Sequence, residues 1–99
     1  MKPLVISTPA SEELAEAVQW TDARRPGWGG KLFDAVVHAT DLILTHPEIG
    51  EARTGRHASR QLRVLGFPYY VAYRIREHEI YIVAIAHTSR RPGYWKSRS

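Results

Sequence analysis

Apolar residues in the first half of the chain recur at the spacing of amphipathic helices. Thr8 is followed by Pro9 and then by the two glutamates at positions 12 and 13, a composition that the first turn of a helix favours. Leu14 and Val18 add an apolar stripe, and Pro26 then interrupts the pattern. We therefore predict a helix with Thr8 as its N-cap that ends near Arg24.

A second helix is predicted after the sequence GWGG at residues 27–30. Apolar residues follow at steps of three and four: Leu32, Phe33, Val36, Val37, Ala39, Ile43 and Leu44. Pro47 bounds this helix near His46. Because the link between the two helices is short, we expect them to form an antiparallel hairpin.

The second half of the chain is rich in Tyr, Val and Ile, as β-strands are. After a polar loop at residues 47–59, we predict strands over residues 61–67, 69–75 and 79–87. A short apolar run at residues 3–7 predicts one further strand at the start of the chain. The last two strands are close enough in sequence to form a tight hairpin.

The last strand has apolar residues on both alternate sets of positions in residues 80–86, which predicts a central strand covered on both faces. With strict alternation, His87 continues its odd-numbered face. The order of elements indicates an α+β fold, in which a two-helix antiparallel hairpin packs on a mostly antiparallel four-stranded sheet that includes the N-terminal strand. The length of 99 residues predicts a single domain, residues 1–99.

The composition argues against several kinds of site. The chain has no cysteine, which excludes disulfides and thiolate–zinc sites and suits a reducing cytoplasm, where we expect the protein to act. Its five histidines lack ligand spacing, and no glycine-rich loop has a phosphate-binding pattern, so we expect neither metal nor cofactor. No apolar run is long enough for a membrane span, and no signal peptide is recognisable.

The charge is distributed unevenly between the two halves of the chain. Residues 1–51 contain four Lys or Arg and eight Asp or Glu, whereas residues 52–99 contain ten and two. This asymmetry favours an acidic or polyanionic partner for the C-terminal half, although a solvated basic face is the alternative.

The densest group of candidate functional residues follows the last strand. It consists of His87, Arg90, Arg91, Tyr94, Trp95, Lys96 and Arg98, which Arg56, His57, Arg60 and Arg63 are expected to approach from the preceding loop and strand. Such side chains could bind phosphate and move protons, as a metal-free ribonuclease requires, or could hold nucleic acid or an acidic protein. The structural alternatives are a His87 that only ends a strand, and a Tyr94 and Trp95 that pack the tail onto the sheet.

The sequence RRPG occurs twice, at residues 24–27 and 90–93. The first copy follows an amphipathic helix and is interpreted as basic residues and a breaker between two helices. The second follows a buried strand within the basic half, so we expect it to belong to the functional surface.

The chain resembles the ParE-like toxins of the RelE/ParE superfamily of type II toxin–antitoxin modules. The resemblance covers almost the whole sequence and rests on PASEELAEAVQW, LFDAVVHATDLILTHPEIGEAR, RQLRV, FPYYVAYRI and IYIVAIAHTSRRPGYWKSR in this order. It implies the same helical hairpin on an antiparallel sheet and a cognate antitoxin that neutralises the toxin and carries any contact with operator DNA. We expect the antitoxin to contact apolar side chains of the hairpin, namely Leu14, Val18, Trp28, Phe33 and Val37.

The superfamily contains two modes of action. RelE-type members cleave mRNA on the ribosome, whereas ParE-type members poison DNA gyrase. Tyr70 stands where the RelE-like pattern usually has Arg, which favours ParE-like inhibition of gyrase and growth arrest without bond chemistry. We then expect the target to bind Arg60, Arg63, Arg90, Arg91, Tyr94, Trp95, Lys96 and Arg98.

The alternative is a metal-independent ribosome-dependent endoribonuclease, with His87, Arg90, Arg91 and Tyr94 as its candidate catalytic residues. A third possibility is a toxin-like protein that has lost potency and only binds its antitoxin.

Overall fold

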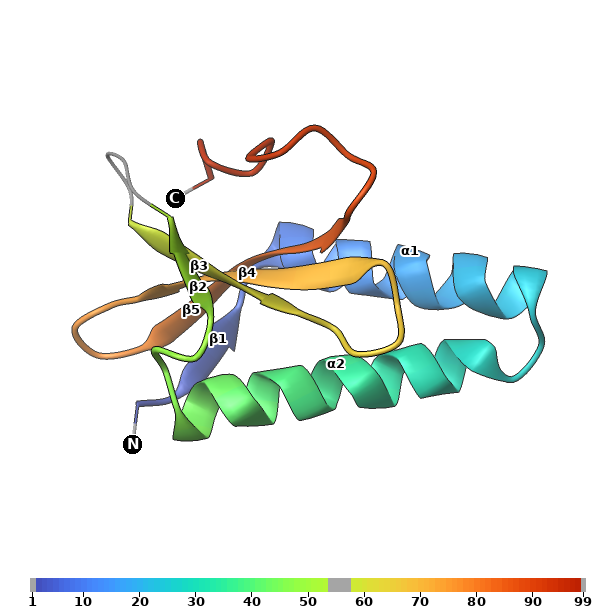
Figure 1. Ribbon diagram of the computed structural model, residues 1–99, viewed down its shortest axis with the longest axis horizontal. Coiled ribbons are helices and arrows are strands. Elements are labelled where there is room, and N and C mark those ends of the chain that lie inside the picture. The colour runs from blue at the N-terminus through green and yellow to red at the C-terminus, as the bar shows by residue number, and fades with distance from the viewer. Residues whose placement is uncertain (1, 54–57, 99) are drawn as a thin grey trace.

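The computed structural model describes residues 2–53 and 58–98 of the chain and contains two helices and five strands (Figure 1). In chain order these are β1 (Leu4–Ile6), α1 (Thr8–Arg24), α2 (Trp28–Thr45), β2 (Glu51–Arg53), β3 (Ser59–Arg63), β4 (Tyr69–Ile75) and β5 (Ile80–His87). The α+β class and the helical hairpin are confirmed. Within the described residues, neither helix has the length and apolar content that crossing a bilayer requires.

The sheet has the strand order β1-β5-β4-β3-β2, with β1 parallel to β5 and all other neighbours antiparallel. It therefore has five strands and not the predicted four. The additional strand, β2, lies in the segment predicted as a loop, and all three of its residues are exposed. Because it pairs with β3 through the backbone and buries no side chain, its sequence carries no alternating apolar pattern.

Further boundaries differ from the prediction: α2 begins at Trp28, inside the GWGG sequence and not after it, and β3 begins at Ser59 and not at residue 61. Two more differences are explained by hydrogen bonds and backbone conformation. The N-cap of α1 is Ser7, and not Thr8, because the Ser7 hydroxyl accepts the Ala10 N–H at 3.2 Å. The strand predicted over residues 61–67 corresponds to β3, which ends at Arg63. It ends there because Gly66 adopts a positive φ of 85° and the Val64 N–H donates to the Tyr69 carbonyl.

The turn between the helices depends on an aspartate and two glycines. Asp22 Oδ1 accepts the N–H groups of Gly27 at 2.9 Å and Gly29 at 3.1 Å, so it caps the start of α2 from the end of α1. A Cβ at Gly29 would lie only 2.7 Å from the Val18 carbonyl oxygen. The helices can approach this closely because the glycine has no side chain. The first RRPG copy thus forms the tip of the helical hairpin.

One face of the sheet packs on both helices and forms the larger core (Figure 1). The helices contribute Leu32, Val36, Ala39 and Ile43 from α2 together with Ala10 and Ala17 from α1. Tyr73 extends this core toward the end of α2, where its hydroxyl donates to the Pro47 carbonyl at 2.7 Å and accepts the Gly50 N–H at 2.9 Å.

The C-terminal segment, residues 88–98, covers the opposite face of the sheet. Trp95 is fully buried there against Ala72, Val83 and Ala84. Its indole Nε1–H donates to the Tyr70 hydroxyl at 3.0 Å. The central strand β5 is therefore covered on both faces, as its sequence predicted.

A β-bulge changes the side-chain alternation of β5. Ala84 pairs with Ala72 but Ile82 pairs with Tyr73, so Val83 is an extra residue. As a result, Ile80 and Ile82 lie on the helical face together with Ile85, while Val83 turns toward Trp95. The prediction that His87 shares a face with Tyr81 and Val83 is therefore wrong, because strict alternation fails at the bulge.

The burial of Trp95 makes it the main apolar anchor of the C-terminal segment. We expect Trp95→Ala to lower the free energy of unfolding by about 3–5 kcal/mol, since it removes a fully buried indole and leaves a cavity. Urea denaturation measures this loss. Trp20→Ala is the matched control: its side chain is 53 % exposed, so we expect a loss below about 1 kcal/mol. Equal losses in the two variants would contradict the assigned role of Trp95.

Candidate functional site

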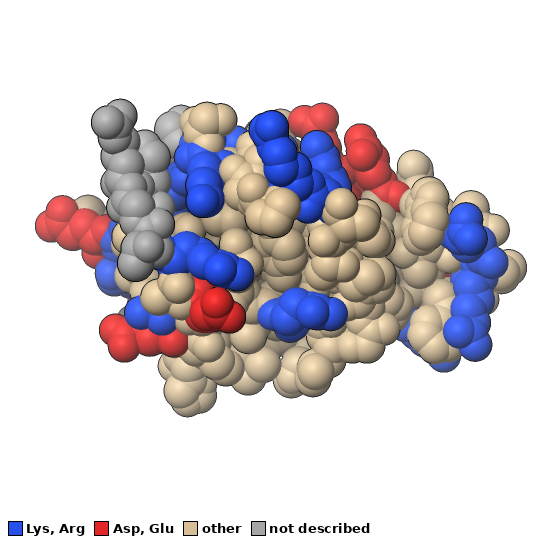
Figure 2. Space-filling view, turned by 45° about the horizontal axis from the view of Figure 1, so that its top comes forward, with Lys and Arg blue, Asp and Glu red and all other residues tan. Residues whose placement is uncertain are grey.

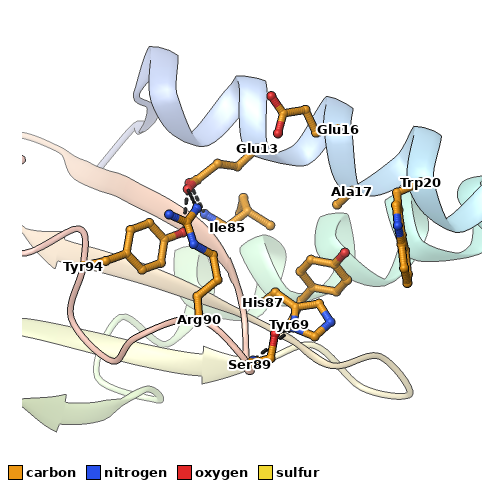
Figure 3. Close-up of a pocket in the computed structure, with 10 residues that line it drawn as sticks. All are labelled: Glu13, Glu16, Ala17, Trp20, Tyr69, Ile85, His87, Ser89, Arg90 and Tyr94. Carbon is orange, nitrogen blue, oxygen red and sulfur yellow. Dashed lines mark hydrogen bonds and ion pairs between the residues drawn. The ribbon is translucent and has the colours of Figure 1, made fainter.

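The carboxylate of Glu13 connects α1 with β5 and the C-terminal segment (Figure 3). Its Oε1 accepts the Ile85 N–H at 3.1 Å and Arg98 Nη1–H at 3.0 Å. Its Oε2 accepts the Tyr94 hydroxyl at 2.5 Å and Arg98 Nη2–H at 3.2 Å, while Arg90 Nη1 lies 3.8 Å away. Since only 13 % of the Glu13 side chain is exposed, these partners replace most of its hydration.

The end of β1 explains why β5 needs side-chain partners. Strand β1 pairs with β5 only as far as Ile82, so no strand of the described residues lies beside the following backbone groups of β5 on this edge. The Val83 carbonyl accepts from Ser7 Oγ and from Arg98 Nη1, each at 3.2 Å. Together with the bond from Ile85 to Glu13, these contacts satisfy the edge of the sheet where α1 begins.

Tyr94 is held by Glu13 and covered by a guanidinium. The pKa of its phenol is raised well above its usual value, first by burial and then by the hydrogen bond and negative charge of Glu13. The Arg90 guanidinium carbon lies 3.8 Å from the centre of the Tyr94 ring. The Tyr94 hydroxyl is therefore a protonated donor whose acceptor is already bound.

Two arginines link the C-terminal segment to the rest of the fold. The pKa of Arg98 is raised because its guanidinium donates to Glu13. Arg74 is buried in β4 and donates to the Arg98 carbonyl and, at 3.1 Å, to the Lys96 carbonyl. Burial lowers the pKa of Arg74, but these backbone acceptors compensate its charge.

His87 lies at the end of β5, on the side of the sheet that faces the helices. Its Nδ1 accepts the Ser89 N–H at 3.0 Å and lies 2.8 Å from Ser89 Oγ. Its ring packs edge-on against Tyr69, with 5.0 Å between the centroids. Because Nδ1 accepts a backbone N–H, the neutral ring carries its proton on Nε2.

Two hollows flank the second RRPG copy. The first, the α1 groove, has a volume of about 520 Å³ and runs from Glu13 past Tyr69 and His87 to Trp20 (Figure 3). The second has a volume of about 400 Å³ and lies where β2, β3 and β4 meet the C-terminal segment. We call it the basic cleft, after the side chains Arg53, Arg63, Arg90 and Lys96, which line it with Tyr70. Arg90 lines both hollows.

The residues predicted to bind the target are only partly brought together. Arg63, Arg90 and Lys96 meet at the basic cleft, and Arg91 is exposed beside them in sequence. The other members of the set have internal partners: Trp95 is buried, Tyr94 and Arg98 bind Glu13, and Arg60 donates to the carbonyls of Glu48 and Gly50. Arg56 and His57 lie outside the described residues.

The residues predicted to bind an antitoxin differ in exposure. Leu14 and Val18 are half-buried against the core, whereas Phe33 and Val37 on α2 are 47 % and 41 % exposed. Trp28, at the tip of the hairpin, is half-buried and packs against the Arg25 guanidinium at 3.8 Å and the Lys31 ammonium at 4.3 Å.

The sequence did not reveal Glu13 or Arg53 as members of these sites. Glu13 was expected only to stabilise the first turns of α1, and its partners are more than seventy residues away in sequence. Arg74 does carry a signal, since it is a charged residue inside an otherwise apolar strand. Among residues 2–53 and 58–98, no group of three His, Cys, Asp or Glu could hold a metal ion.

The role of Glu13 can be tested through the ionisation of Tyr94. We expect Glu13→Gln to lower the Tyr94 pKa toward 10, because the charge and a strong acceptor are removed while burial remains. NMR of ¹³C-labelled tyrosine rings during an alkaline titration measures the change. Glu16→Gln, in the same groove, is the control and should leave Tyr94 unchanged. An unaltered Tyr94 pKa in Glu13→Gln would contradict the role of Glu13.

The same shift has a consequence for stability. Because the folded-state pKa of Tyr94 lies above its unfolded value, its stabilising contribution is complete below about pH 10 and is lost as the pH rises further. Burial raises the pKa of Tyr69 and Tyr73 as well, so they add to the same trend. The loss of stability above pH 10 should therefore be shallower, but not absent, in Tyr94→Phe.

Comparison with known proteins agrees with this architecture. The chain is similar to a solved structure described as the chromosomal ParDE TA system from P. aeruginosa, with a TM-score of 0.77 at 18 % sequence identity. The alignment covers 90 % of this chain and 98 % of that chain, and it shows a shared fold. No curated protein matches the sequence significantly.

A family model supplies the evidence beyond fold. The model described as the ParE toxin of type II toxin-antitoxin system, parDE, matches residues 4–92. This range begins with β1, includes both helices and the whole sheet, and reaches the second RRPG copy. The chain therefore belongs to the ParE toxin family of type II toxin–antitoxin systems.

Proposed function

We propose that this toxin acts in the cytoplasm by binding DNA gyrase and interfering with its DNA-cleavage cycle, and that a cognate antitoxin neutralises it. The observation that carries this proposal over a ribonuclease is the internal binding of Tyr94. Its hydroxyl donates to Glu13 at 2.5 Å, and its pKa is raised. A phenol in this state is a poor general base, and its proton already has an acceptor.

Tyr70 and His87 support the same interpretation. Tyr70 stands where a ribonuclease of the RelE type would be expected to carry a phosphate-stabilising Arg, and its hydroxyl accepts from Trp95 Nε1 at 3.0 Å. This side chain therefore anchors the C-terminal segment. His87 has Nδ1 bound to Ser89 and its ring against Tyr69, so two of its interaction surfaces are used internally.

The surface that remains for a macromolecular partner is basic. Arg63, Arg90, Arg91 and Lys96 are exposed on or beside the C-terminal segment. Charges arranged in this way steer association with a large anionic partner and fix its orientation. A gyrase–DNA complex offers such a partner without requiring bond chemistry from the toxin.

The antitoxin is proposed from the ParDE system that the fold resembles and from the apolar surface of α2. Phe33 and Val37 are exposed one helical turn apart, which is the spacing that an apolar segment of a partner would contact. Acidic residues of the antitoxin would complement the basic C-terminal half.

The direct test uses purified toxin with gyrase and relaxed plasmid DNA. We expect inhibited supercoiling and an increase in linear plasmid after protein digestion, which reports trapped cleavage complexes. The double variant Arg90→Ala/Arg91→Ala should need about tenfold more toxin, since about 1.4 kcal/mol of binding corresponds to that factor. The matched control is Arg24→Ala/Arg25→Ala in the first RRPG copy, which should act like the wild type. Normal supercoiling, together with mRNA cleavage on translating ribosomes, would overturn the proposal.

A further inference from the structure

The basic cleft gathers four cations from three separate parts of the chain. Arg53 comes from β2, Arg63 from β3, and Arg90 and Lys96 from the C-terminal segment. Glu51 is the acidic residue of the lining, and it lies 3.6 Å from Arg53 Nη1 in an exposed ion pair. Figure 2 shows Lys and Arg side chains spread over the face that carries the C-terminal segment. The excess of positive charge suits an anionic ligand.

Three of these cations are positioned by contacts with their neighbours. Gly93 has a φ of 74°, and a Cβ at this position would lie 2.6 Å from Lys96 Cε, so the glycine lets the lysine stem lie across the turn. Arg90 stacks on Tyr94 at 3.8 Å, and Arg53 Nη2 donates to Gln61 Oε1 at 3.2 Å. Both guanidinium groups retain further N–H donors for a ligand.

The cleft can hold phosphates but offers little for nucleobases. Among the described residues that line it, Tyr70 is the only aromatic one. Tyr70 is half-buried, and its hydroxyl is engaged by Trp95. Binding of single strands normally depends on aromatic rings on which unpaired bases stack. The lining instead suits a nucleic acid whose bases are paired and whose backbone faces the protein.

We propose that the basic cleft binds the backbone phosphates of duplex DNA, with Arg63 and Lys96 as direct contacts. In assigning this duplex to the DNA held by gyrase, the inference rests on the function proposed above. The toxin would then contact both the enzyme and its DNA. The second RRPG copy would serve both contacts, because Arg90 reaches the cleft and Gly93 places Lys96.

The first experiment measures binding of the purified toxin to a fluorescein-labelled 24-base-pair duplex by fluorescence anisotropy at several salt concentrations. We expect affinity to fall steeply with salt, because phosphate contacts release counterions. Arg63→Ala and Lys96→Ala should each weaken binding about three- to tenfold and reduce the salt slope by about one. Arg24→Ala and Lys31→Ala, at the hairpin tip, remove the same charges elsewhere and should change affinity less than about twofold.

Two outcomes of this experiment would overturn the inference. The first is equal weakening by the hairpin-tip controls, which would mean that net charge alone attracts DNA. The second is tighter binding of a single-stranded DNA or RNA of the same length. Melting temperatures of all variants establish that they fold. Because the four substituted side chains are exposed, we expect only small changes in melting temperature.

The gyrase assay then separates the two proposals. If Arg63→Ala/Lys96→Ala traps cleavage complexes at wild-type potency, the proposed contact with DNA held by gyrase is refuted while gyrase inhibition stands. If the wild-type toxin binds duplex DNA through these residues but leaves gyrase unaffected, the assignment to gyrase fails while the duplex site stands. Loss of trapping in the double variant, with wild-type behaviour of Arg24→Ala/Lys31→Ala, supports both.

Discussion

The arrangement of the C-terminal segment depends on one largely buried carboxylate. Glu13 accepts hydrogen bonds from β5, from Tyr94 and from both terminal nitrogens of Arg98. An isolated carboxylate would be costly to bury, so each of these donors is needed to compensate its lost hydration. In return, α1 fixes a segment that has no regular secondary structure of its own. The positions of Arg90 and Lys96, and therefore the basic cleft, follow from that attachment.

The β-bulge at Val83 makes this attachment possible. It turns Val83 toward Trp95, and the backbone of β5 beyond the end of β1 is bonded by Ser7, Glu13 and Arg98. The same strand thus packs against the helical hairpin on one face and against the C-terminal segment on the other. Polar contacts at the edge determine where the segment lies, and the buried indole of Trp95 supplies its apolar contact with the sheet.

Local patterns in the sequence predicted the elements that bury a continuous apolar stripe. Both helices, the hairpin of β4 and β5, and the two-sided burial of β5 were predicted for this reason. Strand β2 was missed because none of its side chains is buried, and the bulge was missed because alternation cannot reveal an inserted residue. Of the candidate site, the sequence indicated Arg63, Arg90 and Lys96, but not Glu13. A glutamate in an early turn of a helix is common, and only the tertiary fold brings its partners to it.

The pairing of Glu13 with Arg98 holds the C-terminal segment in place. A double-mutant cycle with Glu13→Gln and Arg98→Met, followed by urea denaturation, measures this coupling directly. We expect a coupling of about 1–2 kcal/mol, which is below the upper range for charged hydrogen bonds because 26 % of the Arg98 side chain is exposed. Losses that add to within about 0.5 kcal/mol would contradict it, since independent sites behave in that way.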